Sequence, residues 1–338
     1  MPKDNENILL PLDGPTTPSQ PMAFGPDEMI RCDTCLRANA PTRAACLYCG
    51  ASLPVTESSS RLRKPLLLTP DKSEPGYNTI LVAHDKVENL PQAAELLKLS
   101  TDAVAKLIAA AQPLPLARTA SLEESELLAE RLNQFGLQTE TISDQRLCLS
   151  DSNVIRVRSM ILSDEMFSVR TLGRGEPLDL RYSNLILMVQ GRLLTKTTSV
   201  KERKSRKSEN EILEATEFYS DELVFDLYCA RRDQTFRVAA NSFDFSCLRE
   251  QKALVVNENM RTLIQVLQNK APQVKIENSY AALRPLLDLV WGSEKATKSD
   301  GWRRDAPGRL TVAATTIVSN ETQFTRYSRL KRILLRQE

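Results

Sequence analysis

Four cysteines in two Cys-x-x-Cys pairs constrain this chain more than any other feature of its sequence. Cys32 and Cys35 form the first pair, Cys46 and Cys49 form the second, and ten residues separate the two. Each Cys-x-x-Cys turn presents both sulfurs to a common centre, so the two turns together predict tetrahedral coordination of zinc by four thiolates. The spacing leaves two alternatives open, which are iron in a rubredoxin-like site and a pair of disulfides.

A site of this kind takes all its ligands from the protein and leaves no position for a reacting water. We therefore expect one structural Zn²⁺ ion that stabilises a fold and does not catalyse. The segment that holds the cysteines, residues 28–52, is too short to bury a hydrophobic core of its own. It is predicted to be a zinc ribbon that folds only around its metal.

The ribbon resembles the zinc finger of Ran-binding nucleoporins. The residues that match this family in type and spacing are Cys32, Cys35, Asn39, Cys46 and Cys49. The tryptophan that the family carries two positions before its first cysteine is Ile30 here, and a generic bacterial zinc ribbon fits the same residues. The resemblance implies binding of single-stranded RNA or of ubiquitin, and the alternative is a purely structural or protein-docking knuckle.

Basic residues in the ribbon and near the end of the chain are candidates for contact with nucleic acid or another anion. They are Arg31, Arg37, Arg43, Arg326, Arg329, Lys331 and Arg332. In the ribbon, Tyr48 is the aromatic side chain on which a base could stack. The terminal segment QFTRYSRLKRILL is basic and amphipathic, so it could lie on a membrane, contact nucleic acid or dock on the protein's own sheet. We expect it to dock intramolecularly.

Composition divides the first half of the chain into four parts. Residues 1–27 are proline-rich and are predicted to be a disordered arm, and residues 53–76 to be a linker between the ribbon and the next module. Residues 77–148 carry the pattern β-α-α-β-α-β of a compact α/β sandwich. In its segments TILVA and PLPLARTASLEESELLAERLNQFGLQTETI, this module resembles the C-terminal domain of the ribosomal stalk protein, which implies a small, rigid protein-binding unit.

The second half is rich in predicted strands. Residues 151–275 are expected to form an antiparallel β domain that ends in a helix, and they resemble bacterial pleckstrin-homology-like domains. The segment KERKSRKSENE within it is predicted to be a long polar loop. Residues 276–338 are expected to be a helical C-terminal extension, in which residues 292–312 are interpreted as loose.

The sequence carries few residues suited to catalysis. His84 is the one histidine, so the cysteines outside the ribbon have little prospect of a catalytic base, and Cys148, Cys229 and Cys247 are predicted to be packed, inert thiols. Glycine-rich nucleotide loops and the motif Gly-x-Ser-x-Gly are absent from the sequence. We therefore predict that the protein is not an enzyme and has no small-molecule substrate.

The expected fold class is α+β and multidomain: a zinc ribbon, a compact α/β sandwich, then an antiparallel β domain with C-terminal helices. The chain as a whole resembles bacterial zinc-ribbon proteins with no assigned function. We predict a non-catalytic, zinc-binding adaptor with protein partners. The alternatives are a single-stranded RNA-binding protein that uses the ribbon and the basic tail, and a peripheral membrane sensor. Without an apolar run long enough for a membrane helix and without a secretory signal, the sequence favours the cytoplasm over the membrane.

Overall fold

The computed structural model of the chain divides into two compact units, Met1–Lys64 and Pro65–Glu338. The structure describes residues 24–43, 45–54, 56, 59, 67, 75–147, 154–171, 176–205, 208–230, 232–306 and 309–335. Most of the predicted disordered arm, residues 1–27, and most of the predicted linker lie outside these ranges. The mixed α+β class predicted from the sequence is confirmed.

The first unit contains little regular structure. Its elements are the 3-10 helix η1 (Pro26–Glu28) and the strands β1 (Ile30–Arg31) and β2 (Ala38–Asn39). The two strands pair antiparallel, with Ile30 opposite Asn39. Ile30 and Leu53 are buried beside two of the cysteines, Cys32 and Cys46. This hydrophobic cluster is too small to hold the segment folded without a further stabilising interaction.

The second unit begins with the predicted β-α-α-β-α-β module. Its elements are β3 (Tyr77–His84), α2 (Leu90–Leu97), α3 (Thr101–Ala109), β4 (Leu114–Thr119), α4 (Leu122–Gln134), β5 (Leu137–Ser143) and α5 (Asp144–Leu147). The strands form a three-stranded antiparallel sheet in the order β4-β3-β5. Ser121 caps α4 by accepting a hydrogen bond from the Glu124 amide at 3.2 Å, and Gly136 follows the helix at a φ of +82°.

The remainder of the unit is built on one large sheet. Its strands are β6 (Val154–Leu162), β7 (Met166–Thr171), β8 (Leu178–Arg181), β9 (Leu185–Ser205), β10 (Ser208–Cys229), β11 (Thr235–Ala239), β12 (Lys275–Glu277), β13 (Glu294–Ala306) and β14 (Arg309–Ser319). They run in the order β13-β14-β9-β10-β11-β6-β7-β8, and β12 pairs with β9 beside this path. The sheet departs from the expected antiparallel pattern in two places, since β11 pairs parallel with β6 and β12 parallel with β9.

Helical elements pack on this sheet. They are η3 (Tyr182–Asn184), η4 (Phe245–Gln251), α6 (Val256–Lys270), α7 (Tyr280–Leu287) and α8 (Glu321–Leu335). One hydrophobic core contains Phe225, Phe236 and Leu263, so it joins β10, β11 and α6. A second core contains Leu128 of the α/β module together with Phe324 of α8. The α/β module and the large sheet are therefore packed together through this second core, whereas the first core belongs to the large sheet and its helices alone.

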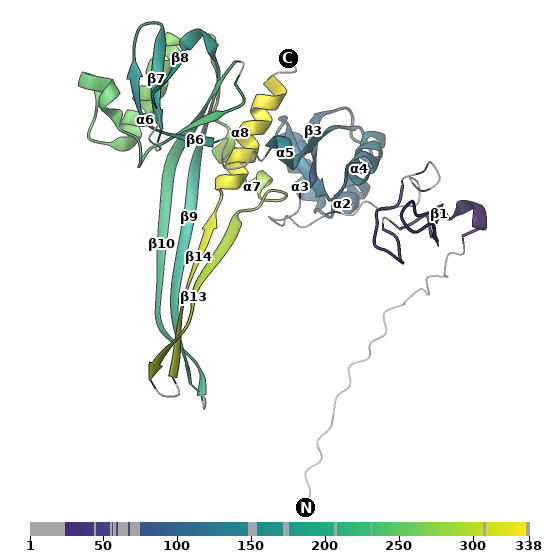
Figure 1. Cartoon of the computed structure of the whole chain (residues 1–338). Helices are drawn as coiled ribbons and strands as arrows, with labels where there is room; N and C mark the ends of the chain where they lie inside the picture. Colours follow the sequence, from purple (N-terminus) through teal and green to yellow (C-terminus); the bar gives the residue numbers. More distant parts are fainter. Residues whose placement is uncertain are drawn as a thin grey trace, which may run out of the picture. The chain divides into compact units, whose positions relative to one another are not determined.

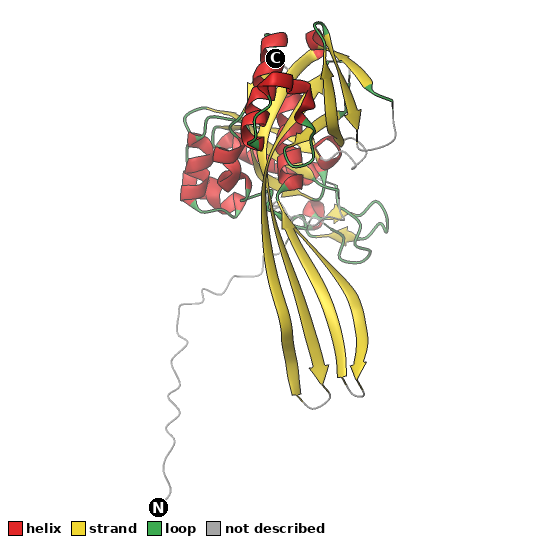
Figure 2. Ribbon diagram, turned by 90° about the vertical axis from the view of Figure 1, so that its left-hand side faces the viewer, coloured by secondary structure: helices red, strands yellow, loops and turns green. Residues whose placement is uncertain are grey.

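Two predictions about the large sheet are wrong. The predicted polar loop at residues 201–211 lies mostly in β9 and β10, and the predicted loose segment at residues 292–312 contains all of β13 and the start of β14. These strands continue beyond the packed part of the unit as a four-stranded extension (Figure 1, Figure 2). We call this extension the arm and define it as residues 195–205, 208–220, 294–306 and 309–319. Its polar residues resemble a loop in sequence because both faces of the arm are open to water.

A buried polar cluster fixes the α/β module to the C-terminal part of the unit. Asp144 accepts hydrogen bonds from the Gly76 amide at 2.9 Å, from Asn78 Nδ2 at 2.8 Å and from Arg118 Nε at 2.7 Å. The Trp291 indole Nε1–H donates to Asn78 Oδ1 at 2.8 Å. Because these groups are buried, each depends on the others for the partners that water would otherwise supply.

Replacing Gly191 by Ala is predicted to destabilise the protein. A Cβ atom at this position of β9 would lie 2.3 Å from Cε2 of Phe324, whose ring is fully buried in the core under α8. The steric overlap should lower the free energy of unfolding by about 1–3 kcal/mol. Urea denaturation of the full chain measures the effect. Gly292→Ala is the control, because the nearest atom to its new Cβ, Asp288 O, lies 3.8 Å away. An equal loss of stability in both variants would contradict the prediction.

Candidate metal centre

The two Cys-x-x-Cys segments fold into two similar turns. In the first, the Leu36 amide donates to the Cys32 carbonyl at 2.8 Å, and in the second the Gly50 amide donates to the Cys46 carbonyl at 3.0 Å. Leu36 and Gly50 have φ values of 59° and 75°, so each turn closes through a residue in the left-handed region. Glycine suits the second position because it has no Cβ to clash in that conformation.

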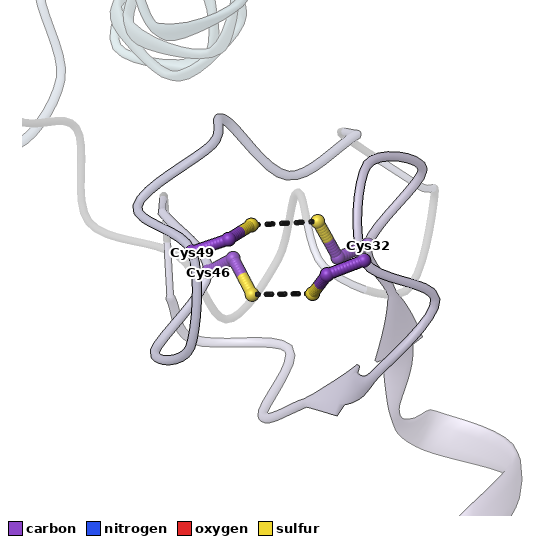
Figure 3. Close-up of side chains that lie close together, drawn as sticks. Cys32, Cys46 and Cys49 are labelled. Carbon is purple, nitrogen blue, oxygen red and sulfur yellow. Dashed lines mark hydrogen bonds between the residues drawn. The ribbon is translucent and has the colours of Figure 1, made fainter.

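The turns bring the four sulfurs together. All four Sγ atoms lie within 4.8 Å of one another. Cys32 Sγ is 3.6 Å from Cys49 Sγ, and Cys35 Sγ is 3.5 Å from Cys46 Sγ (Figure 3). A tetrahedral ion with metal–sulfur bonds of about 2.3 Å needs sulfurs roughly 3.8 Å apart, close to these separations. The cluster is therefore compatible with a zinc ribbon.

The disulfide alternative is not the arrangement in the structure. All four cysteines are free thiols. The shorter of the two sulfur–sulfur distances above, 3.5 Å, is far longer than a sulfur–sulfur bond of about 2.05 Å. Four converging thiol groups form a donor set suited to a soft or borderline metal ion.

Asn39 supports the second turn from β2. Its side chain is buried, its Nδ2 lies 3.4 Å from Cys46 Sγ, and its Oδ1 accepts from the Leu47 amide at 2.8 Å. The Tyr48 amide lies 3.4 Å from the same sulfur. These donors orient Cys46 and favour its thiolate, as hydrogen bonds around a metal ligand commonly do. Asn39 was among the residues that matched the zinc-finger family, and its place in the structure gives a physical reason for an amide there.

The electrostatics of the cluster favour ionised sulfur at Cys46 and Cys32, whereas at Cys49 a hydrogen bond from the Ala51 amide is outweighed by burial and the neighbouring sulfurs, which raise the pKa of Cys49 to about 12. Burial penalises the Cys46 thiolate, but hydrogen bonds from the backbone amides of Tyr48 and Cys49 outweigh this penalty and lower the pKa of Cys46 to about 6. A hydrogen bond from the Cys35 amide likewise lowers the pKa of Cys32. Metal ions bind thiolates, so this environment prepares at least part of the cluster for a ligand role.

The three candidate arginines of the ribbon are exposed. Arg31 Nε donates to the Leu36 carbonyl at 3.0 Å, and Arg43 Nε donates to the Ala45 carbonyl at 3.3 Å. The guanidinium of Arg37 lies over the ring of Tyr48, 4.7 Å from its centroid. These residues remain accessible to an anion, but the structure shows no anion site among them.

The candidate basic residues of the C-terminal segment are placed differently from the ribbon arginines. Arg326, Arg329 and Arg332 of α8 are all less than 9% exposed. Arg329 Nη1 donates to the Asp233 carbonyl at 2.8 Å, and Lys331 Nζ lies 3.1 Å from Glu277 Oε2. The segment therefore docks within the protein, as expected. Its basic groups serve internal contacts, and their contact with nucleic acid stays a prediction.

The other residues considered for catalysis differ in their exposure. Cys229 is buried, Cys247 is partly buried, and burial raises the pKa of each thiol to about 11, as expected of inert packed cysteines. His84 is exposed and lies near the Asp85 carbonyl. Cys148 lies outside the described residues. Among the residues that the structure describes, no helix is long and apolar enough to cross a membrane.

The structure adds a feature that sequence reasoning noticed only in part. Leu36, Leu47 and Tyr48, on the two cysteine turns, are 63%, 63% and 54% exposed. We call these three residues the knuckle surface. Their position immediately beside the cysteines could have revealed them, because a side chain between two metal ligands in a tight turn has little room to fold inward. Only Tyr48 was singled out from the sequence.

The fold and the cluster together define a mixed α+β protein with a four-cysteine centre of metal-binding type. Comparison of the chain with protein-family models, curated proteins and solved structures gives no match. The function is therefore inferred from the geometry of the chain itself.

Proposed function

We propose that this protein is a non-catalytic, zinc-binding interaction protein. The observation that carries the proposal is the convergence of four free cysteine sulfurs within 4.8 Å. A four-thiolate donor set favours zinc, and a site with four protein ligands has no open position for a substrate or reacting water. The ion would stabilise the ribbon, and binding would take place on the surface that the ribbon presents.

The knuckle surface is the part of the ribbon that we assign to a protein partner. Leu36 and Leu47 place large apolar side chains in water without burying them in the small cluster around Ile30 and Leu53. Exposed apolar groups held on a rigid turn are typical of protein contacts, since a partner removes their surface from water without having to order them first.

Binding of single-stranded RNA is the second candidate function. Tyr48 is half exposed and Arg37 stacks on its ring, a pairing that could receive a base and a phosphate. RNA binding would weaken steeply as the salt concentration rises, because phosphate contacts release counterions. Apolar contacts through Leu36 and Leu47 would depend much less on salt.

A pull-down from host lysate with the tagged full chain distinguishes the two functions. If the knuckle surface binds protein, Leu36→Ser combined with Leu47→Ser should reduce the recovered partner about tenfold or more, with or without nuclease. The control is Leu254→Ser, which alters a fully exposed leucine far from the ribbon in sequence. Bound zinc should remain unchanged in all variants. Loss of the partner on nuclease treatment would support the RNA function, and retention by the double variant would contradict a role for the knuckle surface.

A further inference from the structure

The arm exposes both of its faces and both of its edges. None of its described side chains is fully buried, and several large apolar groups are exposed there. These are Ile212, Phe218, Tyr219, Leu310 and Ile317. In the arm, β10 and β13 are the outermost strands of the order β13-β14-β9-β10. The unpaired backbone groups of such edges can hydrogen-bond to another strand.

The two edges carry different charges. Between residues 211 and 222, β10 has five acidic side chains and no Lys or Arg. Between residues 294 and 304, β13 has four basic and two acidic side chains. Two copies of the β10 edge would therefore repel each other, whereas a β10 edge and a β13 edge attract. Charge patterns of this kind select one pairing over another.

One antiparallel register places two of the acidic residues of β10 opposite lysines of β13. In an antiparallel pair, the numbers of opposing residues have a constant sum. The pairs Glu214 with Lys298 and Glu217 with Lys295 both sum to 512, so a single register places both glutamates opposite lysines. Along either strand the two charged residues are three positions apart, so one ion pair would form on each face of the sheet.

Strand direction permits the same pairing. Each neighbouring pair in the arm is antiparallel: β13 with β14, β14 with β9, and β9 with β10. If two arms lie side by side and point the same way, β10 of one is antiparallel to β13 of the next. The antiparallel order of the strands then continues across the contact between the two arms, which we call the junction.

We propose that the arm is a self-association surface, on which β10 of one copy pairs with β13 of a second copy of this chain. Within one arm, Phe218 and Ala296 stand at the same level, since Phe218 pairs with Thr197, Thr197 with Ile317 and Ile317 with Ala296. The register that sums to 512 instead places Thr216 opposite Ala296. Successive arms are thus offset by two residues, roughly 7 Å along the strands. An even offset keeps each residue on its original face.

An open hollow on the arm lies close to the position that Phe218 of the neighbouring copy would occupy. It has a volume of about 360 Å³ and its lining includes Ala296, Lys298 and Ile317. By the strand register, these residues share one face with Phe218. In the proposed junction, Phe218 of one copy stands diagonally next to Ala296 of the other, within reach of that hollow. Phe218 is 65% exposed in the single chain, so the junction would cover apolar surface that is otherwise in water.

The contacts that Glu217 makes within its own chain are compatible with the junction. Its Oε1 lies 2.7 Å from Lys196 Nζ on β9, and its Oε2 accepts from the Tyr219 hydroxyl at 2.9 Å. A carboxylate has about four lone-pair positions and can accept from a second cation as well. The junction is heterologous, because each copy contributes one edge of each kind. Repetition of it generates a closed ring or an open filament.

Sedimentation velocity of the full chain over a range of concentrations tests the proposal. Wild-type protein should form oligomers. Glu214→Lys and Lys298→Glu should each raise the dissociation constant about tenfold, because each places like charges opposite one another. The two single variants mixed together, and the double variant with both changes in one chain, should recover association. Lys252→Glu is the control of equal charge change, since Lys252 is exposed and lies outside the arm.

Three results would overturn the proposal. The first is a wild-type chain that stays monomeric up to its solubility limit. The second is a double variant no better than the single variants, although circular dichroism shows it to be folded. The third is loss of association by Lys298→Glu but not by Glu214→Lys, which would indicate a two-fold contact between β13 strands. The proposal does not depend on zinc, and metal analysis of each variant separates its outcome from that of the ribbon.

Discussion

Replacing Cys46 by Ser is expected to abolish zinc binding and to unfold the ribbon. Cys46 is buried, and its sulfur is 3.5 Å from Cys35 Sγ and 3.4 Å from Asn39 Nδ2, so the substitution removes a ligand that its surroundings hold in place. Structural zinc in peptides of this kind contributes about 10–16 kcal/mol of binding free energy, far more than the few buried apolar groups around Ile30 can supply. The zinc content measured by metal analysis should fall from one ion per chain to none.

Nuclear magnetic resonance of the full chain shows whether the ribbon unfolds. The amide signals of residues 30–53 should lose their dispersion in Cys46→Ser and in wild-type protein treated with a strong chelator. Cys247→Ser is the matched control, because Cys247 lies outside the cluster and should leave both the zinc and the signals unchanged. A dispersed ribbon without metal would contradict the prediction, and iron in the purified protein would identify the alternative four-thiolate site.

The cluster of four cysteines could be predicted from the sequence because its determinants are local. Two Cys-x-x-Cys turns fix four ligands within a short segment, and the turn geometry brings their sulfurs together whatever the rest of the chain does. The α/β module could also be predicted from the sequence, because the residues at the ends of its helices are typical of helix ends. Ser121 caps α4 and Gly136 follows its end in the structure, and both residue types are common at these positions.

The arm could not be predicted, because its stability comes from pairing between distant strands. The segment 201–211 has the composition of a solvated loop, but its charges face partners across the sheet: Arg203 Nη1 lies 3.6 Å from Glu211 Oε2. Similarly, β14 brings residues 309–319 against residues 195–205 of β9, more than a hundred positions away. Hydrophobic alternation identifies strands with one buried face, and the arm has none.

The placement of the C-terminal basic residues illustrates the same limit. The sequence predicted a basic amphipathic segment that docks intramolecularly, but it did not indicate that the arginines would be buried. In the structure, Tyr327 and Phe324 enter the shared core, and the arginines that flank them are buried with them. Arg329 donates a hydrogen bond to the backbone carbonyl of Asp233, and an acceptor of this kind cannot be identified from the pattern of side chains in a sequence. Whether a charged residue on a helix faces water depends on the element packed beside it.

Replacing Arg237 by Met is expected to destabilise the protein by about 3–5 kcal/mol. Arg237 and Asp226 stand opposite each other on β11 and β10, are almost completely buried, and form two parallel hydrogen bonds of 2.8 and 2.9 Å. Arg237 also donates to Glu321 and Thr325 of α8 and stacks on Phe324. Methionine fills a similar volume but leaves the Asp226 carboxylate buried without its counter-charge.

A second substitution tests whether the unpaired Asp226 carboxylate causes the loss of stability. Combining Asp226→Leu with Arg237→Met removes both charges, so most of the lost stability should return, since the penalty comes from the uncompensated ion and not from the loss of the pair itself. Urea denaturation of the full chain, followed by circular dichroism, measures the difference between the single and the double variant.

An exposed pair on β9 and β10 provides a matched control for the buried pair. Arg192 and Asp221 form the same double hydrogen bond, at 2.9 and 2.7 Å, but their side chains are 49% and 47% exposed. Because water solvates whichever charge remains, Arg192→Met should cost less than about 1 kcal/mol. A comparable loss in both single variants would show that the pairing geometry, and not burial, determines the cost. A double variant as unstable as Arg237→Met would mean instead that the contacts of Arg237 with α8 contribute most of its stabilisation.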